Sequence, residues 1–116
     1  MKKNINQTSK ENLVLAIQNH KKNDFQVAEK FYKKHLKSFP GDVEAHNNLG
    51  IMFFQLGERQ QAISCYEKAI KINPNYAEAH NNLGIALKVL GDHEKAINCY
   101  EKAIKINPNY AEAHNN

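Results

Sequence analysis

A perfect internal duplication constrains the fold of this chain more than any other feature. The 18 residues CYEKAIKINPNYAEAHNN occupy positions 65–82 and return unchanged at positions 99–116. The same shift of 34 residues carries NNLGI at 47–51 onto NNLGI at 81–85. Self-similarity at a fixed period of this length is typical of proteins built from stacked structural repeats.

The period divides the chain into a short leader and a repeat domain. We expect residues 1–8 to form a polar leader and residues 9–116 to form the domain. The domain then holds three complete units and part of a fourth, at 9–42, 43–76, 77–110 and 111–116.

Each unit has the pattern of two helices joined by a turn. In the second unit, Leu49 and Phe53 lie on one helical face, and Gly57 is placed to end that helix. Tyr66 belongs to the apolar face of a second helix, which Pro74 ends because proline cannot donate a backbone hydrogen bond. One helix pair cannot bury its own apolar face, so neighbouring units must stack. The sequence therefore predicts an all-α solenoid.

Two finer features are predicted from the same units. Asn75 and Glu78 have the spacing of a capping box at the start of the third unit. Gly50 and Gly84 fall inside a helix, where a glycine costs about 1 kcal/mol relative to alanine. Because this glycine recurs at one position of the repeat, we expect it to permit a close packing contact.

Composition and charge exclude several classes of protein. The mean hydropathy is −0.70, and no apolar run is long enough to span a membrane. The basic N-terminus lacks the apolar segment of a signal peptide, so we expect a cytoplasmic location. Residues 1–42 carry a net charge of +5 and residues 43–116 carry −1. Because the lysines are scattered and only one arginine is present, we interpret the basic third as solvated surface and expect no nucleic-acid partner.

The pattern within each unit resembles that of the tetratricopeptide repeat (TPR) family. The second unit carries the residues of the family pattern at Leu49, Gly50, Phe53, Gly57, Ala62, Tyr66, Ala69 and Pro74. The third unit carries a similar set 34 residues later, and the first unit is looser, which suits a terminal repeat. The resemblance implies a right-handed superhelix of three helix–turn–helix repeats plus a partial fourth, whose first helices line a concave groove.

The resemblance also implies that the groove binds the ligand. The side chains that we expect to face it are Ile17, Asn47, Asn48, Ile51, Phe54, Asn81, Asn82, Ile85 and Lys88. They form an apolar row beside a row of amides, and an amide can both accept and donate hydrogen bonds to the backbone of an extended peptide. Asn48, Asn82 and Asn116 match the asparagine ladder of the O-linked N-acetylglucosamine transferase TPR arrays. The alternative is that these asparagines only support neighbouring helices.

One activity of the family is not expected here. TPR domains that bind the C-terminal carboxylates of chaperones use a clamp of lysine, arginine and asparagine. The positions that match the clamp are Leu13, Ile17, Asn48, Glu78 and Asn82. Only the Asn48 position fits, and Glu78 has the wrong charge. We therefore predict that the chain does not bind acidic chaperone tails.

No cluster of residues indicates catalysis. His46, His80 and His114 replace the tryptophan of the family pattern and lie one repeat apart, roughly 10 Å, which is too far to share one metal ion. Cys65 and Cys99 are also one repeat apart, beyond the roughly 7 Å that a disulfide allows, so we expect free thiols. The sequence has no phosphate-binding glycine loop and no metal motif. We therefore expect a non-catalytic protein without a metal or cofactor.

The sequence favours a scaffold that binds an extended segment of a partner protein in its groove. Two alternatives remain open. The first is that the chain is the substrate-recognition part of a larger transferase, similar to a glycosyltransferase. The second is a homo-oligomer that forms head to tail through an open C-terminal end, because a solenoid that lacks a polar capping helix exposes an apolar face.

Overall fold

The fold consists of helices alone in the part of the chain that the structure describes. The computed structural model describes residues 5–109, with side chains from residue 11 onward. Its six helices are α1 (Ile5–Lys21), α2 (Phe25–Ser38), α3 (Val43–Gln55), α4 (Arg59–Ile72), α5 (Ala77–Val89) and α6 (His93–Ile106). The molecule is elongated, with principal extents of 53 × 26 × 21 Å. The prediction of an all-α solenoid is confirmed.

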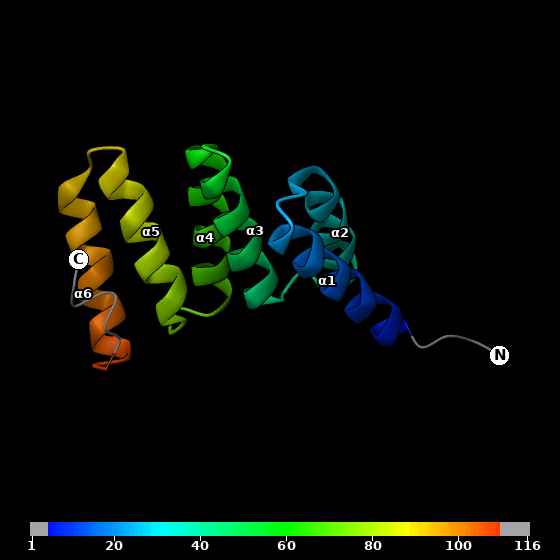
Figure 1. The fold of residues 1–116 in the computed structure, drawn as a ribbon. Coiled ribbons are helices and arrows are strands. Elements are labelled where there is room, and N and C mark those ends of the chain that lie inside the picture. Colours follow the sequence, from blue (N-terminus) through cyan, green and yellow to red (C-terminus); the bar gives the residue numbers. More distant parts are fainter. Residues whose placement is uncertain (1–4, 110–116) are drawn as a thin grey trace.

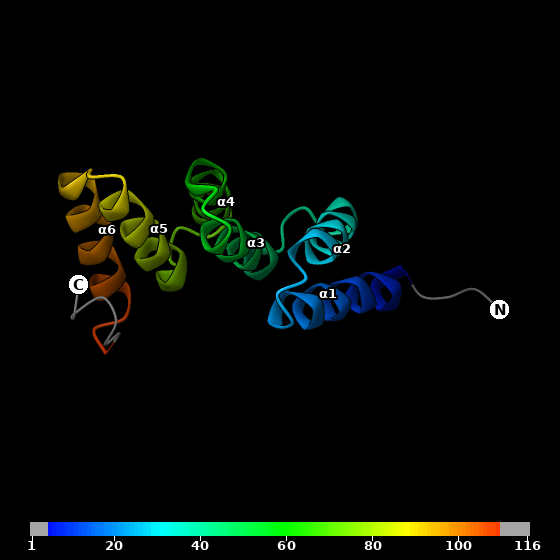
Figure 2. The ribbon, with the colours of Figure 1, turned by 45° about the horizontal axis from the view of Figure 1, so that its top comes forward.

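The three helix pairs follow one another in a row (Figure 1). Contact between the pairs is made chiefly by α2 with α3 and by α4 with α5. Among the first helices, α1 also contacts α3, and α3 contacts α5. The view turned by 45° separates α2 and α4 from α1 and α3 on the two sides of the row (Figure 2). The first helices therefore form one layer, on which the predicted groove residues lie.

The described helices begin before the predicted repeat domain and stop before its partial fourth unit. α1 begins at Ile5, so helical structure extends into the segment that we expected as a polar leader. The partial fourth unit, with His114 and Asn116, lies outside the described residues. Within residues 5–109, none of the helices combines the length and apolar character that a bilayer crossing requires.

A residue with left-handed backbone geometry ends the first helix of each pair. Gly57 and Gly91 have φ angles of 81° and 91°, at the positions predicted for the turn. The N–H groups of Gly57 and Glu58 bond back to the carbonyls of Phe54 and Phe53, which closes the helix end. The first unit places Asn23 here with a φ of 63°. Asparagine is among the few residues other than glycine that adopt this geometry readily.

The predicted capping box at Asn75 is wrong. The N–H of Asn75 donates to Oδ1 of Asn73, and α5 starts after Tyr76 without a side-chain cap. The reason is that the Asn73 side chain closes an Asx turn within the loop, so Asn75 lies before the cap position. Aspartates cap three other helices: Asp24, Asp42 and Asp92 accept hydrogen bonds from the N–H groups of Val27, Ala45 and Lys95.

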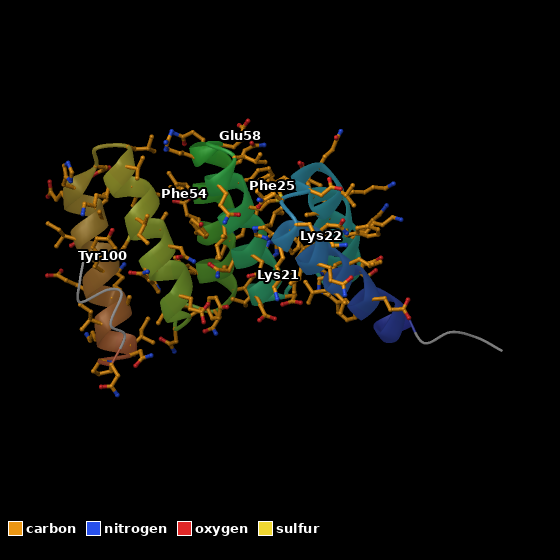
Figure 3. All side chains as sticks on the ribbon, viewed as in Figure 1. Lys21, Lys22, Phe25, Phe54, Glu58 and Tyr100 are labelled. Atoms are coloured by element: carbon orange, nitrogen blue, oxygen red, sulfur yellow. The ribbon has the colours of Figure 1, made fainter. Side chains whose placement is uncertain are left out.

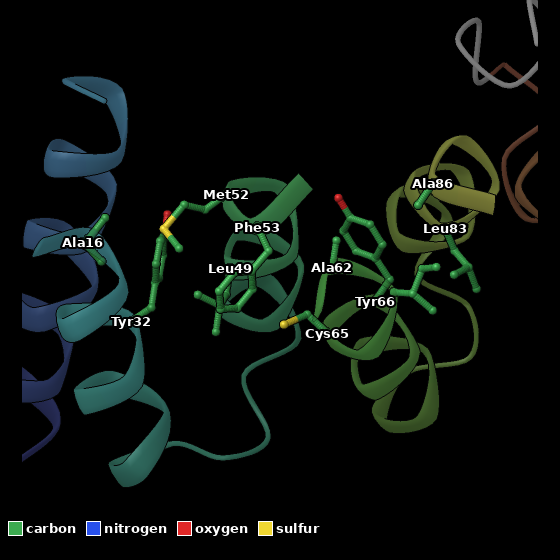
Figure 4. Close-up of a cluster of buried hydrophobic side chains, with 12 residues drawn as sticks. Ala16, Tyr32, Leu49, Met52, Phe53, Ala62, Cys65, Tyr66, Leu83 and Ala86 are labelled. Carbon is green, nitrogen blue, oxygen red and sulfur yellow. The ribbon is translucent and has the colours of Figure 1, made fainter. Parts of the chain in front are cut away.

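The core is a continuous cluster shared by neighbouring repeats. Tyr32, Tyr66 and Tyr100 hold the same position in α2, α4 and α6, and all three are buried. Met52 of α3 reaches Tyr32 of the preceding repeat, and Leu83 of α5 lies beside Tyr66 (Figure 4). Tyr32 and Tyr66 are thus packed both by their own repeat and by the next one.

The recurring glycine of the first helices permits the closest of these contacts. A Cβ atom on Gly50 would lie 2.6 Å from Cε1 of Tyr66, and one on Gly84 would lie 2.6 Å from Cε1 of Tyr100. Both distances are far below van der Waals contact, so either the ring or the helix would have to move. The packing role that the sequence predicted for this glycine is confirmed.

Candidate functional site

The residues predicted to face the groove divide into a buried and an accessible set. Asn47 and Asn81 are only 1% and 0% exposed, so their side chains belong to the interior. The accessible set consists of Ile17, Asn48, Ile51, Phe54, Asn82, Ile85 and Lys88. Lys88 is exposed, and the others are half-buried. We call this set the first-helix face. It presents one accessible asparagine on α3 and one on α5.

An amide pair joins the first helices of the second and third repeats. Nδ2 of Asn82 donates to Oδ1 of Asn47 across 3.1 Å. Because Asn47 is buried, this bond satisfies an acceptor that water cannot reach. Asn82 therefore has a structural task, and part of its hydrogen-bonding capacity is already used.

Asn48 differs from Asn82 because its neighbour in the preceding repeat is apolar. The residue of α1 that corresponds to Asn47 is Leu13, which offers no acceptor. Within the described part of the chain, no residue hydrogen-bonds to the Asn48 amide. Its donors and its acceptor are therefore open to a ligand.

Ile17 and Asn48 come together in a hollow of about 330 Å³ between α1 and α3. The other lining residues are His20, Lys21, Asn23, Tyr32 and Gln55. The ring of His20 joins two of the other lining residues. Its Nε2 lies 2.6 Å from Oε1 of Gln55, and its Nδ1 lies 2.9 Å from the Tyr32 hydroxyl. Because a carbonyl oxygen only accepts, Nε2 donates to Gln55, and in that tautomer Nδ1 is the atom that can accept from the Tyr32 hydroxyl. The hollow thus offers an apolar side chain, a free amide and a lysine.

The other residues of the first-helix face lie outside this hollow. Ile51 and Phe54 are partly buried and pack against the core cluster from α3. Ile85 and Lys88 hold the corresponding positions on α5, so Lys88 places a charge where α3 has an aromatic ring. The labelled side chains in Figure 3 show Phe54 on α3 in the middle of the row, with Lys21 and Lys22 at the end of α1. On this face, α5 is therefore more polar than α3.

The histidines that replace the family tryptophan bind the loop before their helix. Nε2 of His46 donates to the carbonyl of Pro40, and Nε2 of His80 donates to the carbonyl of Pro74, both across 2.8 Å. His114 lies outside the described residues. Among residues 5–109, no three His, Cys, Asp or Glu side chains are grouped so that they could hold a metal ion.

Sequence reasoning missed a buried pair between the first two repeats. His35 is 2% exposed, and its Nε2 lies 2.6 Å from Oδ2 of Asp42, in the loop before α3. The pair forms part of a second hollow of about 690 Å³, lined by Leu13, Val14, His35, Ser38, Phe39, Pro40, Gly41 and Asp42. The signal available in the sequence was that His35 takes a position that is Ala69 in the second repeat and Ala103 in the third.

The amide pair leads to a prediction about stability. Replacing Asn82 with alanine removes the donor to Asn47 and leaves a buried acceptor without a partner, so we expect a loss of about 1–3 kcal/mol. Asn48→Ala removes no hydrogen bond within the described chain and should stay within about 0.5 kcal/mol of the wild type. Urea denaturation of the two variants measures the difference. Asn47→Leu, which copies Leu13, is the control background: there, Asn82→Ala should cost far less.

The thiols are free, as predicted, and burial raises the pKa of both. Desolvation raises the pKa of Cys65 from 9.0 to about 11. Because the thiolate is the nucleophile, a Cys99→Ser variant should react with a disulfide reagent about 100-fold more slowly at pH 8 than a thiol of pKa 9. The rate should keep rising tenfold per pH unit up to about pH 11. A plateau near pH 9 would show that the thiol reacts from an opened, solvated state.

Comparison with known proteins agrees with this architecture. A family profile described as tetratricopeptide repeat matches residues 77–110, and a second, described as TPR repeat, matches residues 50–91. Together the two matches span residues 50–110, which is more than half of the chain. A search of curated proteins gave no match.

Two solved structures are similar over nearly the whole chain. The first TPR of Spaghetti (RPAP3), bound to the HSP90 peptide SRMEEVD, superposes with a TM-score of 0.89 at 25% identity, over 94% of this chain and 86% of that chain. A mutant of the Thermobaculum terrenum O-GlcNAc transferase superposes with a TM-score of 0.87 at 27% identity, over 98% of this chain but only 22% of that chain. With six helices in three stacked pairs and these two profile matches, the chain belongs to the tetratricopeptide repeat family.

Proposed function

We propose that this chain is a non-catalytic, cytoplasmic interaction scaffold that binds an extended peptide segment of a partner protein along its first-helix face. The observation that carries the proposal is the hollow between α1 and α3, where the free amide of Asn48 lies beside the apolar side chain of Ile17. An amide can pair with the backbone of an extended chain, whereas isoleucine receives an apolar side chain of that segment.

The similarity to a TPR domain solved with a bound peptide supports a peptide as the class of ligand. The charges of the site favour a peptide that is less acidic than the one bound by that TPR domain. The positions of the carboxylate clamp carry apolar Leu13 and Ile17, and an exposed acid at Glu78. The segment that fits this face therefore presents apolar side chains and its backbone, rather than a cluster of carboxylates.

The proposal is tested by selecting ligands from a display library of extended 12-residue peptides. Peptides that bind the wild-type chain should lose about tenfold in affinity with Asn48→Ala, because the bond from the free amide is lost. Ser64→Ala, on the exposed side of α4, is the matched control and should leave the affinity unchanged. If no peptide is enriched, or if Asn48→Ala has no effect on the selected peptides, the proposed site is wrong.

The acidic peptide gives a separate prediction. We expect SRMEEVD, the peptide held by the similar TPR domain, to bind this chain more weakly than about 1 mM, because Glu78 repels its carboxylates and the clamp residues are missing. Isothermal titration at low salt measures this directly. Micromolar binding would contradict the prediction and would place acidic tails among the ligands.

A second candidate function has one observation in its favour. The chain is similar to a segment of an O-GlcNAc transferase, of which it spans 22%. A first-helix face of this kind could present substrate segments to a transferase domain. Copurification of glycosyltransferase activity with the native protein, lost with Asn48→Ala, would favour substrate presentation over a free-standing scaffold.

A further inference from the structure

The C-terminal ends of the first helices change in chemistry from one repeat to the next. The two residues at this place are Lys21 and Lys22 in the first repeat, Gln55 and Leu56 in the second, and Val89 and Leu90 in the third. The backbone of the last two ends is the same, because the φ and ψ angles are −78° and −5° at Leu56 and −77° and −5° at Leu90. One framework therefore presents a basic, a mixed and an apolar end along the row.

Stacking of repeats leaves this edge of the molecule uncovered. Leu56 is 45% exposed although α5 packs on its repeat, and Leu90 is exposed to the same degree, 46%. Gln55 is likewise exposed with α5 in place, and its counterpart Val89 is 50% exposed. The exposure of these side chains therefore does not depend on whether a further repeat follows. Exposed apolar side chains that gather on one surface are typical of interaction sites.

The hollow between α1 and α3, which we call the first junction, offers an excess of hydrogen-bond donors. Oε1 of Gln55 is taken by His20, and none of the described residues bonds to Nε2 of Gln55, so this amide group has its donors left for a ligand. Lys21 adds an ammonium group, which has three donors and no acceptor. The side chain that best complements these groups is a carboxylate, because it only accepts hydrogen bonds and carries the opposite charge.

Two acidic residues near the first junction do not cancel its positive charge. Asp24 already uses its carboxylate to cap α2. Burial and, to a smaller extent, the charge of Glu44 raise the pKa of Tyr32, which lines the hollow. Glu44 begins α3, however, whereas Gln55 ends it, roughly 16 Å further along the helix axis. The two lysines at the end of α1 therefore keep the Gln55 end of the hollow positive.

The second junction, between α3 and α5, has apolar residues at the corresponding positions. Phe54 takes the place of His20, and Val89 takes the place of Gln55. His20 and Gln55 are bonded across the first junction, so the repeat sets Phe54 beside Val89 across the second. Phe54 lies in the middle of the row (Figure 3) and is half-buried. The second junction is therefore suited to a large apolar side chain.

The two junctions lie one repeat apart, roughly 10 Å. An extended chain rises about 3.3 Å per residue, so about three residues span this distance. Resting on the proposed function, we propose that the bound segment places an aspartate or glutamate in the first junction and, three residues away, a large apolar side chain in the second. The peptide SRMEEVD has no acidic and apolar residue at this spacing, which agrees with the weak binding predicted for it.

The test selects the 12-residue display library in parallel on the wild-type chain and on a variant with exchanged junction residues. The variant combines His20→Phe, Lys21→Gln and Gln55→Val, which copies Phe54, Gln55 and Val89 into the first junction. The repeat itself shows that these residues fit their helix positions. The wild type should enrich an acidic and a large apolar residue three positions apart, whereas the variant should enrich apolar residues at both positions.

One enriched peptide gives a second measurement, by fluorescence anisotropy. Lys21→Glu should weaken its binding about tenfold, because a charge-assisted hydrogen bond is replaced by repulsion. The same peptide with its acidic residue changed to the amide should not be weakened by Lys21→Glu, and its affinity should depend less on salt. Lys68→Glu, the same charge reversal on the exposed side of α4, is the matched control and should bind like the wild type.

The outcomes distinguish this proposal from the proposed function. If the wild-type chain enriches no peptide, the proposed function is wrong and the acid–apolar spacing is wrong with it. If the enriched peptides depend on Asn48 but share no acidic and apolar residue at this spacing, only the spacing is wrong. Enrichment of the same acidic residue by the variant with exchanged junction residues would also overturn the assignment of the carboxylate to the first junction.

Discussion

Tyr66→Ala is expected to remove a large part of the stability of this chain. Tyr66 is 2% exposed and is packed by Gly50 of its own repeat and by Leu83 of the next. Truncating a buried aromatic side chain to alanine costs about 3–5 kcal/mol, through lost burial and the cavity that remains. A domain of this size has a total free energy of unfolding of about 5–15 kcal/mol. Urea denaturation followed by helical circular dichroism measures the loss.

The same substitution in the last repeat provides the matched control. Tyr100 has the same neighbours within its own repeat, but no described helix follows α6. We therefore expect Tyr100→Ala to cost about half as much as Tyr66→Ala. Equal losses would mean that contact with the next repeat adds nothing to the core, which contradicts the stacked arrangement.

The second large effect is expected for Gly50→Val. The first added carbon would already lie 2.6 Å from a ring carbon of Tyr66 and 3.1 Å from Cβ of Cys65. Overpacking of a well-filled core costs about 1–3 kcal/mol, and a branched side chain falls at the upper end. Gly50→Ala should cost less, because about 1 kcal/mol of helix propensity offsets part of the strain. Thermal and urea unfolding of both variants test the order.

Two other positions of the chain serve as references for the Gly50→Val prediction. Gly41, in the loop before α3, has no heavy atom within 4 Å of its would-be Cβ, so Gly41→Val should be nearly neutral. The first repeat carries a buried Ala16 at the position of Gly50, which shows that a methyl group can be accommodated there. If Gly50→Val were as stable as the wild type, the close helix approach would not be needed for packing.

The repeat period predicted the fold because the local signals for helices and turns in the sequence agreed with it. Apolar spacing, the turn glycines and Pro74 all mark the same boundaries, and the structure places helix ends there. The position of Gly50 inside a helix also carried information, since a costly residue recurs only where packing requires it. The capping box at Asn75 failed because the loop Asx turn of Asn73 competes for the same backbone, and a spacing pattern does not show that competition.

The candidate site was less accessible to sequence reasoning. Asn47 and Asn48 are neighbours and chemically identical, but a rotation of 100° about the helix axis buries one and leaves the other half-exposed. The bond from Asn82 to Asn47 joins residues 35 positions apart, so it depends on the stacking of repeats. The amide of Asn48 is free because Leu13, the residue of the preceding repeat that corresponds to Asn47, offers no acceptor. The sequence contains Leu13, but its relation to Asn48 depends on how the helices pack.

The most direct test of the central claim is to locate a bound peptide by NMR. A peptide selected on the wild-type chain would be titrated into ¹⁵N-labelled protein while the backbone amide resonances are followed. The account predicts that the largest shifts occur on α1 and α3, around Ile17, Asn48 and Ile51, and that exposed positions of α4 such as Lys68 do not move. Shifts confined to α2 and α4, with α1 and α3 unchanged, would contradict a binding site on the first-helix face.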